Sequence, residues 1–260
     1  MPKNPHVFDV KAETEHIIEW TKQWFDKNGP EASAVLGISG GKDSTVMAAI
    51  LAKALGPKRV VGVAMPDGYQ EDLSDSVRVI ELLGINGMIA DIGDVTKAMK
   101  SSFANARPLN GFVVPEFSEN ARINTPPRVR MADLYAVAAS LPNGGFVCNT
   151  CNLSEDYIGY ATKYGDAAGD FAPLADYTVS EIRIIGDYLG LPWSLVHKTP
   201  SDGLCGQTDE IKIGFSYAVL DVYIRYGQCP DRDVRAKIDR MHAASAHKRE
   251  LMQFCPRLAA

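Results

Sequence analysis

The string GISGGKDS at residues 37–44 constrains the fold of this chain more than any other feature. It follows an apolar run at residues 34–38, typical of a buried strand, and precedes residues 44–55, whose apolar spacing predicts a helix. The N–H groups and the dipole of a helix N-terminus favour an anion, and Gly40 and Gly41 let the backbone approach it closely. The string therefore predicts a phosphate-binding turn between a strand and a helix.

The spacing within this string excludes the two commonest phosphate loops. A Walker A loop needs a longer gap than the one between Gly37 and Gly41, and a Ser or Thr where Asp43 follows Lys42. The glycine spacing of a dinucleotide fingerprint is missing as well. A carboxylate among phosphates is repulsive unless a cation lies between them, so Asp43 predicts a bridging Mg²⁺. A plain glycine turn capped by Asp43 or Ser44 is the alternative that needs no ligand.

Strands and helices alternate along most of the chain. Strands are predicted at residues 34–38, 59–65, 87–92 and 145–149. Helices are predicted at residues 13–28, 44–55, 73–83, 94–104, 128–141, 178–189, 209–226 and 231–251, with loops at 107–127 and 201–208. Alternation of this kind predicts an α/β fold with a doubly wound open parallel sheet flanked by helices, followed by C-terminal helices. Ligands of such sheets bind at the carboxyl ends of the strands, so the loops at Ser39, Met65 and Thr150 are expected to meet.

Composition limits the function classes. The 260 residues, 46% of them hydrophobic, suffice for one large domain, and a net charge of −5 argues against a protein that coats nucleic acid or an anionic membrane. The N-terminus has no apolar signal core and no apolar run is long enough for a membrane span. Five cysteines without a signal peptide indicate reduced thiols in the cytoplasm. Cys148 and Cys151 form a single C-x-x-C, which indicates incidental thiols rather than a metal or redox site.

Three later motifs select a family. The string SGGKDS resembles the pyrophosphate loop of the N-type ATP pyrophosphatases, which cleave ATP between its α and β phosphates, but this loop is shared by several enzyme classes. The strings NTCNLSE at residues 149–155, GYATKYGD at 159–166 and GDFAPL at 169–174 resemble the signature of the ammonia-dependent NAD synthetases. The resemblance covers nearly the whole chain. It implies one synthetase domain at residues 1–260, with a pyrophosphatase core at about 30–200 and a helical part at about 209–256.

The resemblance also implies a role for individual residues. Asp43 and Glu155 would share the metal ion and act in catalysis. The residues implied to contact ATP are Gly37, Ile38, Ser39, Gly40, Gly41, Lys42, Asp43, Ser44, Arg130, Thr150 and Ser201. The residues implied to contact deamido-NAD are Arg128, Lys163, Asp170, His247 and Lys248. Without the resemblance, most of these charges would be ordinary solvated surface.

The sequence departs from the family at a position that matters for charge. The helix that follows Thr178 commonly carries, in relatives, a lysine that contacts ATP, and Val179 stands in its place. The loop after Leu204 is also shorter than in many relatives. We expect Lys42 or Lys198 to replace the lost positive charge.

The implied reaction is the ATP- and Mg²⁺-dependent amidation of deamido-NAD (nicotinic acid adenine dinucleotide) to NAD through an acyl-adenylate, with release of AMP and pyrophosphate. The chain begins close to the synthetase motifs, so free ammonia is the expected nitrogen donor unless a separate glutaminase supplies it. The family resemblance implies a homodimer. Two alternatives remain at this point: another N-type pyrophosphatase such as a tRNA-modifying enzyme, which would favour a basic surface, or a degenerate nucleotide-binding homologue.

Overall fold

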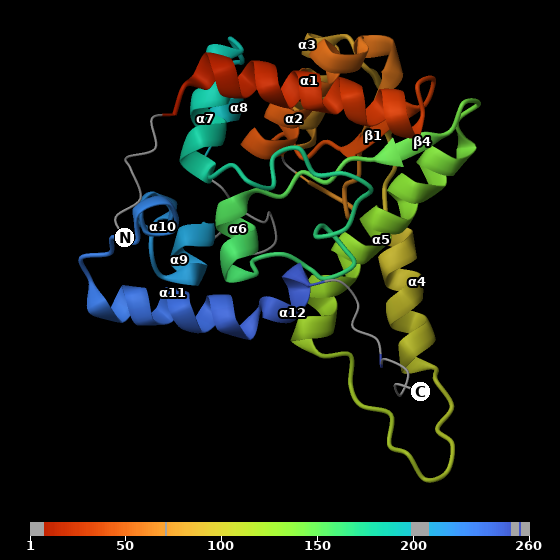
Figure 1. The fold of residues 1–260 in the computed structure, drawn as a ribbon. Helices are drawn as coiled ribbons and strands as arrows, with labels where there is room; N and C mark the ends of the chain where they lie inside the picture. The colour runs from red at the N-terminus through yellow and green to blue at the C-terminus, as the bar shows by residue number, and fades with distance from the viewer. Residues whose placement is uncertain (1–7, 71, 199–207, 251–254, 256–260) are drawn as a thin grey trace, which may run out of the picture.

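A four-stranded parallel sheet forms the centre of the protein (Figure 1). The computed structural model describes residues 8–70, 72–198, 208–250 and 255. The strands are β1 (Ser33–Gly37), β2 (Val60–Ala64), β3 (Asn86–Ile89) and β4 (Gly145–Val147), in the order β3-β2-β1-β4. The predicted open parallel sheet is thereby confirmed.

The strand order places a ligand site at one point of the sheet. The chain moves outward from β1 to β2 to β3, and then returns so that β4 pairs with the other edge of β1. Ser33 pairs with Gly145 and Val35 with Val147, so the two strands end side by side. Connections leave in opposite directions from this pair, which makes the carboxyl ends of β1 and β4 the topological switch point.

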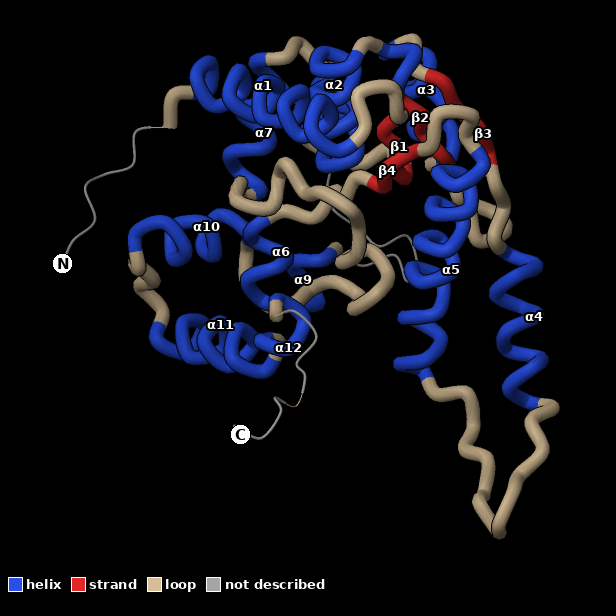
Figure 2. Tube along the Cα trace, turned by 45° about the vertical axis from the view of Figure 1, so that its right-hand side comes forward, coloured by secondary structure: helices blue, strands red, loops and turns tan. Residues whose placement is uncertain are grey.

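Helices cover both faces of the sheet (Figure 2). Before β4 the helices are α1 (Val10–Asn28), α2 (Lys42–Leu55), the 3₁₀ turn η1 (Pro57–Arg59), α3 (Leu73–Leu83), α4 (Gly93–Ala104) and α5 (Glu119–Ser140). After β4 they are α6 (Leu153–Ile158), α7 (Val179–Tyr188), α8 (Trp193–Val196), α9 (Asp209–Ile213), α10 (Tyr217–Tyr226), α11 (Arg232–Ala244) and α12 (Ala246–Arg249). None of the helices in the described part of the chain is long and apolar enough to cross a membrane.

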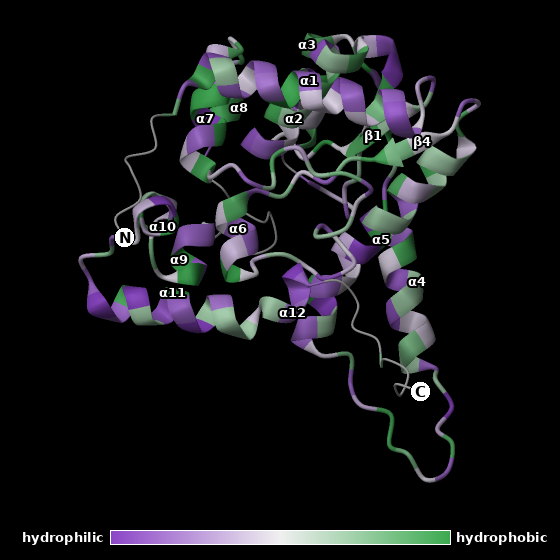
Figure 3. Cartoon of the chain, viewed as in Figure 1, coloured by the Kyte–Doolittle hydropathy of each residue, from purple (hydrophilic) through white to green (hydrophobic). Residues whose placement is uncertain are grey.

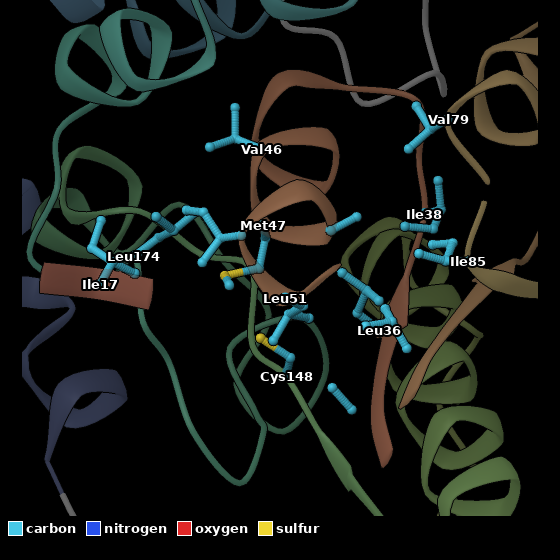
Figure 4. Packing of buried hydrophobic residues seen from close by; sticks show 14 of the residues in the cluster. Ile17, Leu36, Ile38, Val46, Met47, Leu51, Val79, Ile85, Cys148 and Leu174 are labelled. Carbon is cyan, nitrogen blue, oxygen red and sulfur yellow. The ribbon is translucent and has the colours of Figure 1, made fainter. Parts of the chain in front are cut away.

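Alternation along β1 divides the core into two clusters. Leu36 packs under α1, α2 and α7, together with Met47 and Leu51 of α2 (Figure 4). Val35, the next residue of the strand, points to the opposite face and packs with Leu134 of α5. Burial on both faces explains why the strands of this sheet read as apolar runs.

The C-terminal helices have a third apolar cluster of their own. Ile158 of α6, Val179 of α7, Leu220 of α10 and Ile238 of α11 pack together, away from the sheet. Ile238 is the buried residue of α11, whose outer surface is largely hydrophilic (Figure 3). This cluster attaches the helical part to α6 and α7 and thereby to the carboxyl ends of the strands.

The predicted boundary between the loop at 107–127 and the helix after it was wrong. The loop predicted at residues 107–127 ends earlier, because Ser118 caps a helix that starts at Glu119 and continues through two prolines. Proline inside a helix removes a hydrogen bond; here Pro126 is buried and Pro127 packs closely on Gly165, so tertiary packing overrides the local preference.

The predicted helix at residues 209–226 is two helices. Gly214 adopts a left-handed conformation (φ 80°) and ends α9, and Ser216 caps α10. The helix predicted at 231–251 likewise divides at Ser245 into α11 and α12. A helical pattern of apolar residues continued across both breaks, which is why the sequence did not separate the helices.

Candidate active site

The phosphate loop connects β1 to α2 at the switch point. Gly40 has a positive φ of 75°, and a Cβ there would be 3.0 Å from the backbone nitrogen of Ser76 in α3. Ser39 accepts a hydrogen bond from the Gly41 amide (3.2 Å) and contacts the Ser44 hydroxyl (3.1 Å). Gly41 provides no side-chain cap for α2. The loop is therefore held in shape by its own hydroxyls, while the helix N-terminus remains suited to an anion.

Asp43 and Glu155, the acid pair, converge on one amine. Lys42 Nζ lies 2.8 Å from Asp43 Oδ2 and 3.8 Å from Glu155 Oε1, and its side chain is only 4% exposed. Asp43 belongs to the first turn of α2 and Glu155 to the first turn of α6, which follow β1 and β4. Adjacent parallel strands thus bring together two acids that are distant in the sequence.

Asn152 connects the acid pair. Its Nδ2 donates to Asp43 Oδ1 (3.1 Å), and its Oδ1 accepts from the Glu155 amide (3.0 Å) as the N-cap of α6. Asn152 is fully buried. One side-chain amide therefore caps the helix that carries one acid and orients the other acid.

Charge at the acid pair is unbalanced. Burial and the negative charge of Asp43 raise the pKa of Glu155, and Lys42 offsets this only in part. Burial disfavours the charged form of Lys42, but Asp43 and Glu155 outweigh it, and its pKa is raised. Two acids that repel each other in a buried site are an arrangement that a divalent cation would relieve.

Tyr217, at the start of α10, completes the wall of this site. It is 1% exposed, and its ring centroid lies 5.8 Å from Lys42 Nζ. Its hydroxyl is buried and has no hydrogen-bond partner within the described residues. Burial, followed by the charges of Glu155 and Asp209, raises the pKa of Tyr217, so the ring stays neutral.

The other predicted ATP contacts lie at the rim of the same edge. Arg130 Nε donates to the carbonyl of Met65, just beyond β2 (2.9 Å), and a Cβ on Gly37 would be 3.1 Å from Met65 Cε. Thr150 follows β4 and is half-buried. The three strand-end loops therefore gather at one edge, as the sequence predicted. Ser201 lies outside the described residues.

Four of the five predicted deamido-NAD contacts gather at a second location, here called the substrate end: Arg128, Lys163, His247 and Lys248. Lys163 Nζ donates to the His247 carbonyl (2.5 Å), and Arg128 Nε donates to the Lys163 carbonyl (3.2 Å). Lys248 Nζ donates to the carbonyls of Gly159 (2.8 Å) and Ala161 (2.7 Å). The structure thus brings together residues from α5, from the segment after α6 and from α12.

Asp170 occupies one side of a hollow of about 250 Å³ that is also lined by Asn149 and Asp156. Its carboxylate accepts hydrogen bonds from the Val147 amide (2.7 Å) and from the Tyr135 hydroxyl (3.2 Å). Burial and the charge of Asp170 raise the pKa of Tyr135 to about 12. Asp170 is therefore held as a fixed acceptor at the end of β4.

Cys148 and Cys151 are buried free thiols. Cys151 Sγ contacts the Asp166 carbonyl (3.1 Å), and burial raises the pKa of both thiols, so neither is poised as a nucleophile. Within the described residues no group of three or more His, Cys, Asp and Glu side chains is arranged to hold a metal ion.

Sequence reasoning missed Asn152, Tyr217 and Arg183. Asn152 lies inside the NTCNLSE string, and its position three residues before Glu155 is the spacing of an N-cap, a signal that was present. The other two have no such signal, because α10 and α7 come near Lys42 only through tertiary packing.

The comparisons with known proteins agree with this geometry. A family model described as NAD synthase matches residues 13–252. The NH(3)-dependent NAD(+) synthetase of Archaeoglobus fulgidus is 34% identical over 244 residues, which cover 91% of this chain and 93% of that protein.

Solved structures of the same fold also match. An NMN synthetase from Francisella tularensis has a TM-score of 0.84 at 30% identity, covering 97% of this chain and 100% of its own. An NH3-dependent NAD synthetase from Campylobacter jejuni has a TM-score of 0.74 at 24% identity, covering 96% and 100%. With a family model that spans most of its length, and with a phosphate loop and an acid pair built at one sheet edge, the chain belongs to the NAD synthase family.

Proposed function

We propose that this protein converts deamido-NAD to NAD, using ATP and ammonia. The observation that carries the proposal is the convergence of Asp43 and Glu155 beside an uncapped helix N-terminus at the switch point of the sheet. Family membership supports the same reaction.

The chemistry follows from the substrate. A carboxylate is a poor electrophile, because its charge repels nucleophiles and an oxide leaves badly. One carboxylate oxygen attacks the α phosphorus of ATP, the bond to the β-phosphate oxygen breaks, and an acyl-adenylate and pyrophosphate form. Ammonia then attacks the acyl carbon, loses a proton and displaces AMP, leaving the amide. Each step needs charge on phosphate oxygens to be neutralised, rather than a protein nucleophile.

The loop residues are suited to hold the triphosphate. The first-turn amides of α2 point toward the loop, and Gly40 and Gly41 place no side chain in the way of phosphate oxygens. Lys42 adds a positive charge within this cradle. We propose that Arg130, Thr150 and Ser201 also contact ATP.

The acid pair fits Mg²⁺. This ion is held in nucleotide enzymes by one or two carboxylates together with phosphate oxygens and water, and Asp43 and Glu155 supply two converging carboxylates whose mutual repulsion a cation relieves. When bound, the ion would neutralise charge that develops on the transferred phosphate. Asn152 keeps Asp43 oriented for that contact.

The direct test is an assay of the purified protein with ATP, Mg²⁺, ammonium and deamido-NAD, with NAD and pyrophosphate as the measured products. We expect both to form in equal amounts, and glutamine to replace ammonium poorly. Failure to form NAD across a range of pH would refute the proposal and favour a nucleotide-binding homologue without activity.

A second candidate substrate is nicotinic acid mononucleotide, which carries the same carboxylate without the adenylate half. One observation favours it: the solved structure with the TM-score of 0.84 is described as an NMN synthetase. Measuring kcat/KM for the mononucleotide and the dinucleotide in parallel decides between the two. A ratio above about tenfold, a difference of 1.4 kcal/mol in transition-state binding, identifies the preferred substrate.

We also propose that the protein is a homodimer that uses the projecting arm formed by α4, residues 105–118 and α5 (Figures 1 and 2). The arm exposes Leu109, Phe112 and Val113, of which Val113 is 82% exposed. Leu109 and Phe112 also line a hollow of about 460 Å³. A second copy would cover this apolar surface. Sedimentation is expected to give a dimer for the wild type and a monomer for Phe112→Glu; a wild-type monomer at all concentrations would contradict the proposal.

A further inference from the structure

Val179 leaves the nucleotide site without the lysine that the family carries at this position. The side chain is fully buried in the apolar cluster with Ile158 and Leu220, and the Val179 amide donates to Ser154 Oγ (3.0 Å). No charge could replace valine here without disturbing the cluster. The missing cation must therefore come from another position.

The two expected replacements are already neutralised. Lys42 is held between Asp43 and Glu155. Lys198 Nζ lies 2.9 Å from Asp72 Oδ2 and 2.7 Å from Asp75 Oδ2. Both ammonium groups are therefore paired with carboxylates in this structure, and a phosphate would compete with those carboxylates for them.

Arg183 lies one turn after Val179 on the same face of α7. The helix runs alongside α2: a Cβ on Gly186 would be 3.1 Å from Val46 Cγ2, and Val46 is one turn after Lys42. The Val179 amide donates to Ser154 Oγ, and Ser154 adjoins Glu155, so the N-terminal end of α7 lies beside the acid pair. Arg183 follows this end by one turn.

Among the residues that the structure describes, no hydrogen bond or ion pair joins the Arg183 guanidinium to another group. Its Nε is buried without a hydrogen bond, and within the described residues no acid forms an ion pair with it. By contrast, Arg225, which also contacts α7, is paired with Glu181 at 2.6 Å. A partly buried cation that faces a second cation is costly unless an anion binds there.

We propose that Arg183 binds the phosphates of ATP that leave as pyrophosphate, and so supplies the charge that Val179 does not. This inference rests on the proposed use of ATP. A planar guanidinium forms two parallel hydrogen bonds to one phosphate, and it needs no displacement of an existing carboxylate to do so.

The experiment compares nucleotides that differ only in their phosphates. Calorimetry with Mg²⁺ measures the Kd of AMP, of pyrophosphate and of an ATP analogue whose α–β bridge is a methylene, for wild type, Arg183→Gln and Arg183→Lys. We expect Arg183→Gln to weaken the ATP analogue and pyrophosphate by about tenfold or more, with AMP changed less than twofold. The Kd values of Arg183→Lys are expected to lie between those of Arg183→Gln and the wild type. Arg240→Gln, on the exposed face of α11, is the control and should give wild-type Kd values.

Equal Kd values for the ATP analogue in wild type and Arg183→Gln would overturn the inference. So would equal weakening of AMP and ATP, because that pattern indicates a structural defect. If Arg183→Gln does not fold, the Kd values of the three ligands are compared between Arg183→Lys and the wild type instead. Binding needs no turnover, so a protein that fails the amidation assay while Arg183→Gln selectively loses pyrophosphate would refute the proposed function and leave this inference standing.

Discussion

At the phosphate loop, charged side chains contact one another, whereas at the substrate end the cations contact backbone carbonyls. Lys42 is buried against two carboxylates, and Asn152 fixes one of them. Lys163 and Lys248 instead donate to the carbonyls of His247, Gly159 and Ala161.

The difference concerns how each end can respond to a ligand. A charge pair in a buried site resists rearrangement, so the phosphate loop is organised before ATP arrives. A lysine on a neutral carbonyl gives up a weaker bond, and it can turn to a phosphate at little cost. We therefore expect substitutions at the loop to lower kcat, and substitutions at the substrate end to raise KM.

Asp43→Asn should have the largest effect. It keeps the shape of the side chain but removes one of the two charges that would hold Mg²⁺, so kcat is expected to fall by at least about 10³-fold. Steady-state kinetics at saturating Mg²⁺ measure the loss. Asp94→Asn, at the fully exposed start of α4, is the matched control and should retain full activity. An active Asp43→Asn enzyme would show that the acid pair is not the metal site.

Asn152→Ala should have the next largest effect. Loss of the amide frees Asp43 to rotate and uncaps α6, and we expect activity to fall by about 10–100-fold and the apparent affinity for Mg²⁺ to weaken with it. Measuring the rate as a function of Mg²⁺ concentration separates the loss of maximal activity from the loss of Mg²⁺ affinity. Asp231→Ala removes a comparable N-cap from α11, away from the site, and controls for the stability cost of about 1 kcal/mol. Equal activity losses in the two variants would show that Asn152 contributes only to stability and has no role in the active site.

Lys248→Met should affect the substrate end alone. We expect KM for deamido-NAD to rise by about tenfold while KM for ATP and kcat change little, since the proposed contact to the substrate is one charge-assisted bond. The variant also loses the two hydrogen bonds to Gly159 and Ala161. Lys97→Met, on the exposed surface of α4, is the control. A lower melting temperature with unchanged KM would mean that Lys248 only anchors α12 to the chain after α6.

Lys198→Met should have the smallest effect, on stability rather than on catalysis. Partial burial raises the pKa of Asp72, but its hydrogen bond from Lys198 outweighs this and the net pKa is lowered. A lowered pKa in the folded state stabilises the protein above the unfolded value of 3.8, and this contribution is lost as pH falls through the folded value. Urea unfolding should show the variant about 1 kcal/mol less stable at pH 7, with the difference shrinking as the pH falls below 3.8. A large rise in KM for ATP would instead assign Lys198 to the nucleotide.

Much of this site could be predicted because its signals are local. Gly40, Gly41 and Asp43 lie in one string between a strand and a helix, and the structure places β1 and α2 within two residues of the predicted bounds. The pairing of Glu155 with Asp43 was implied by the family resemblance, and the parallel strands that end at one edge account for it physically. Thr178 and Glu181 form a capping box at the start of α7, which is likewise a signal contained in four consecutive residues.

The rest depends on packing between distant segments. The start of α5 at Glu119 could not be predicted, because prolines disfavour a helix. The close packing of Pro127 on Gly165, which compensates for this, is visible only in the structure. Arg183 looks like a surface residue in the sequence, and it becomes notable only when α7 lies along α2. Contacts between two segments that are distant in the sequence leave no periodic pattern from which they could be predicted.

Gly159 ends α6 in the left-handed conformation, and a Cβ there would collide with Ser245 at the junction of α11 and α12. α6 is six residues long and carries Glu155 in its first turn, so it is about 9 Å from end to end and too short to flex. The tight contact at Gly159 therefore ties the helix that carries Glu155 to the junction of the two C-terminal helices, with no room for a side chain between them.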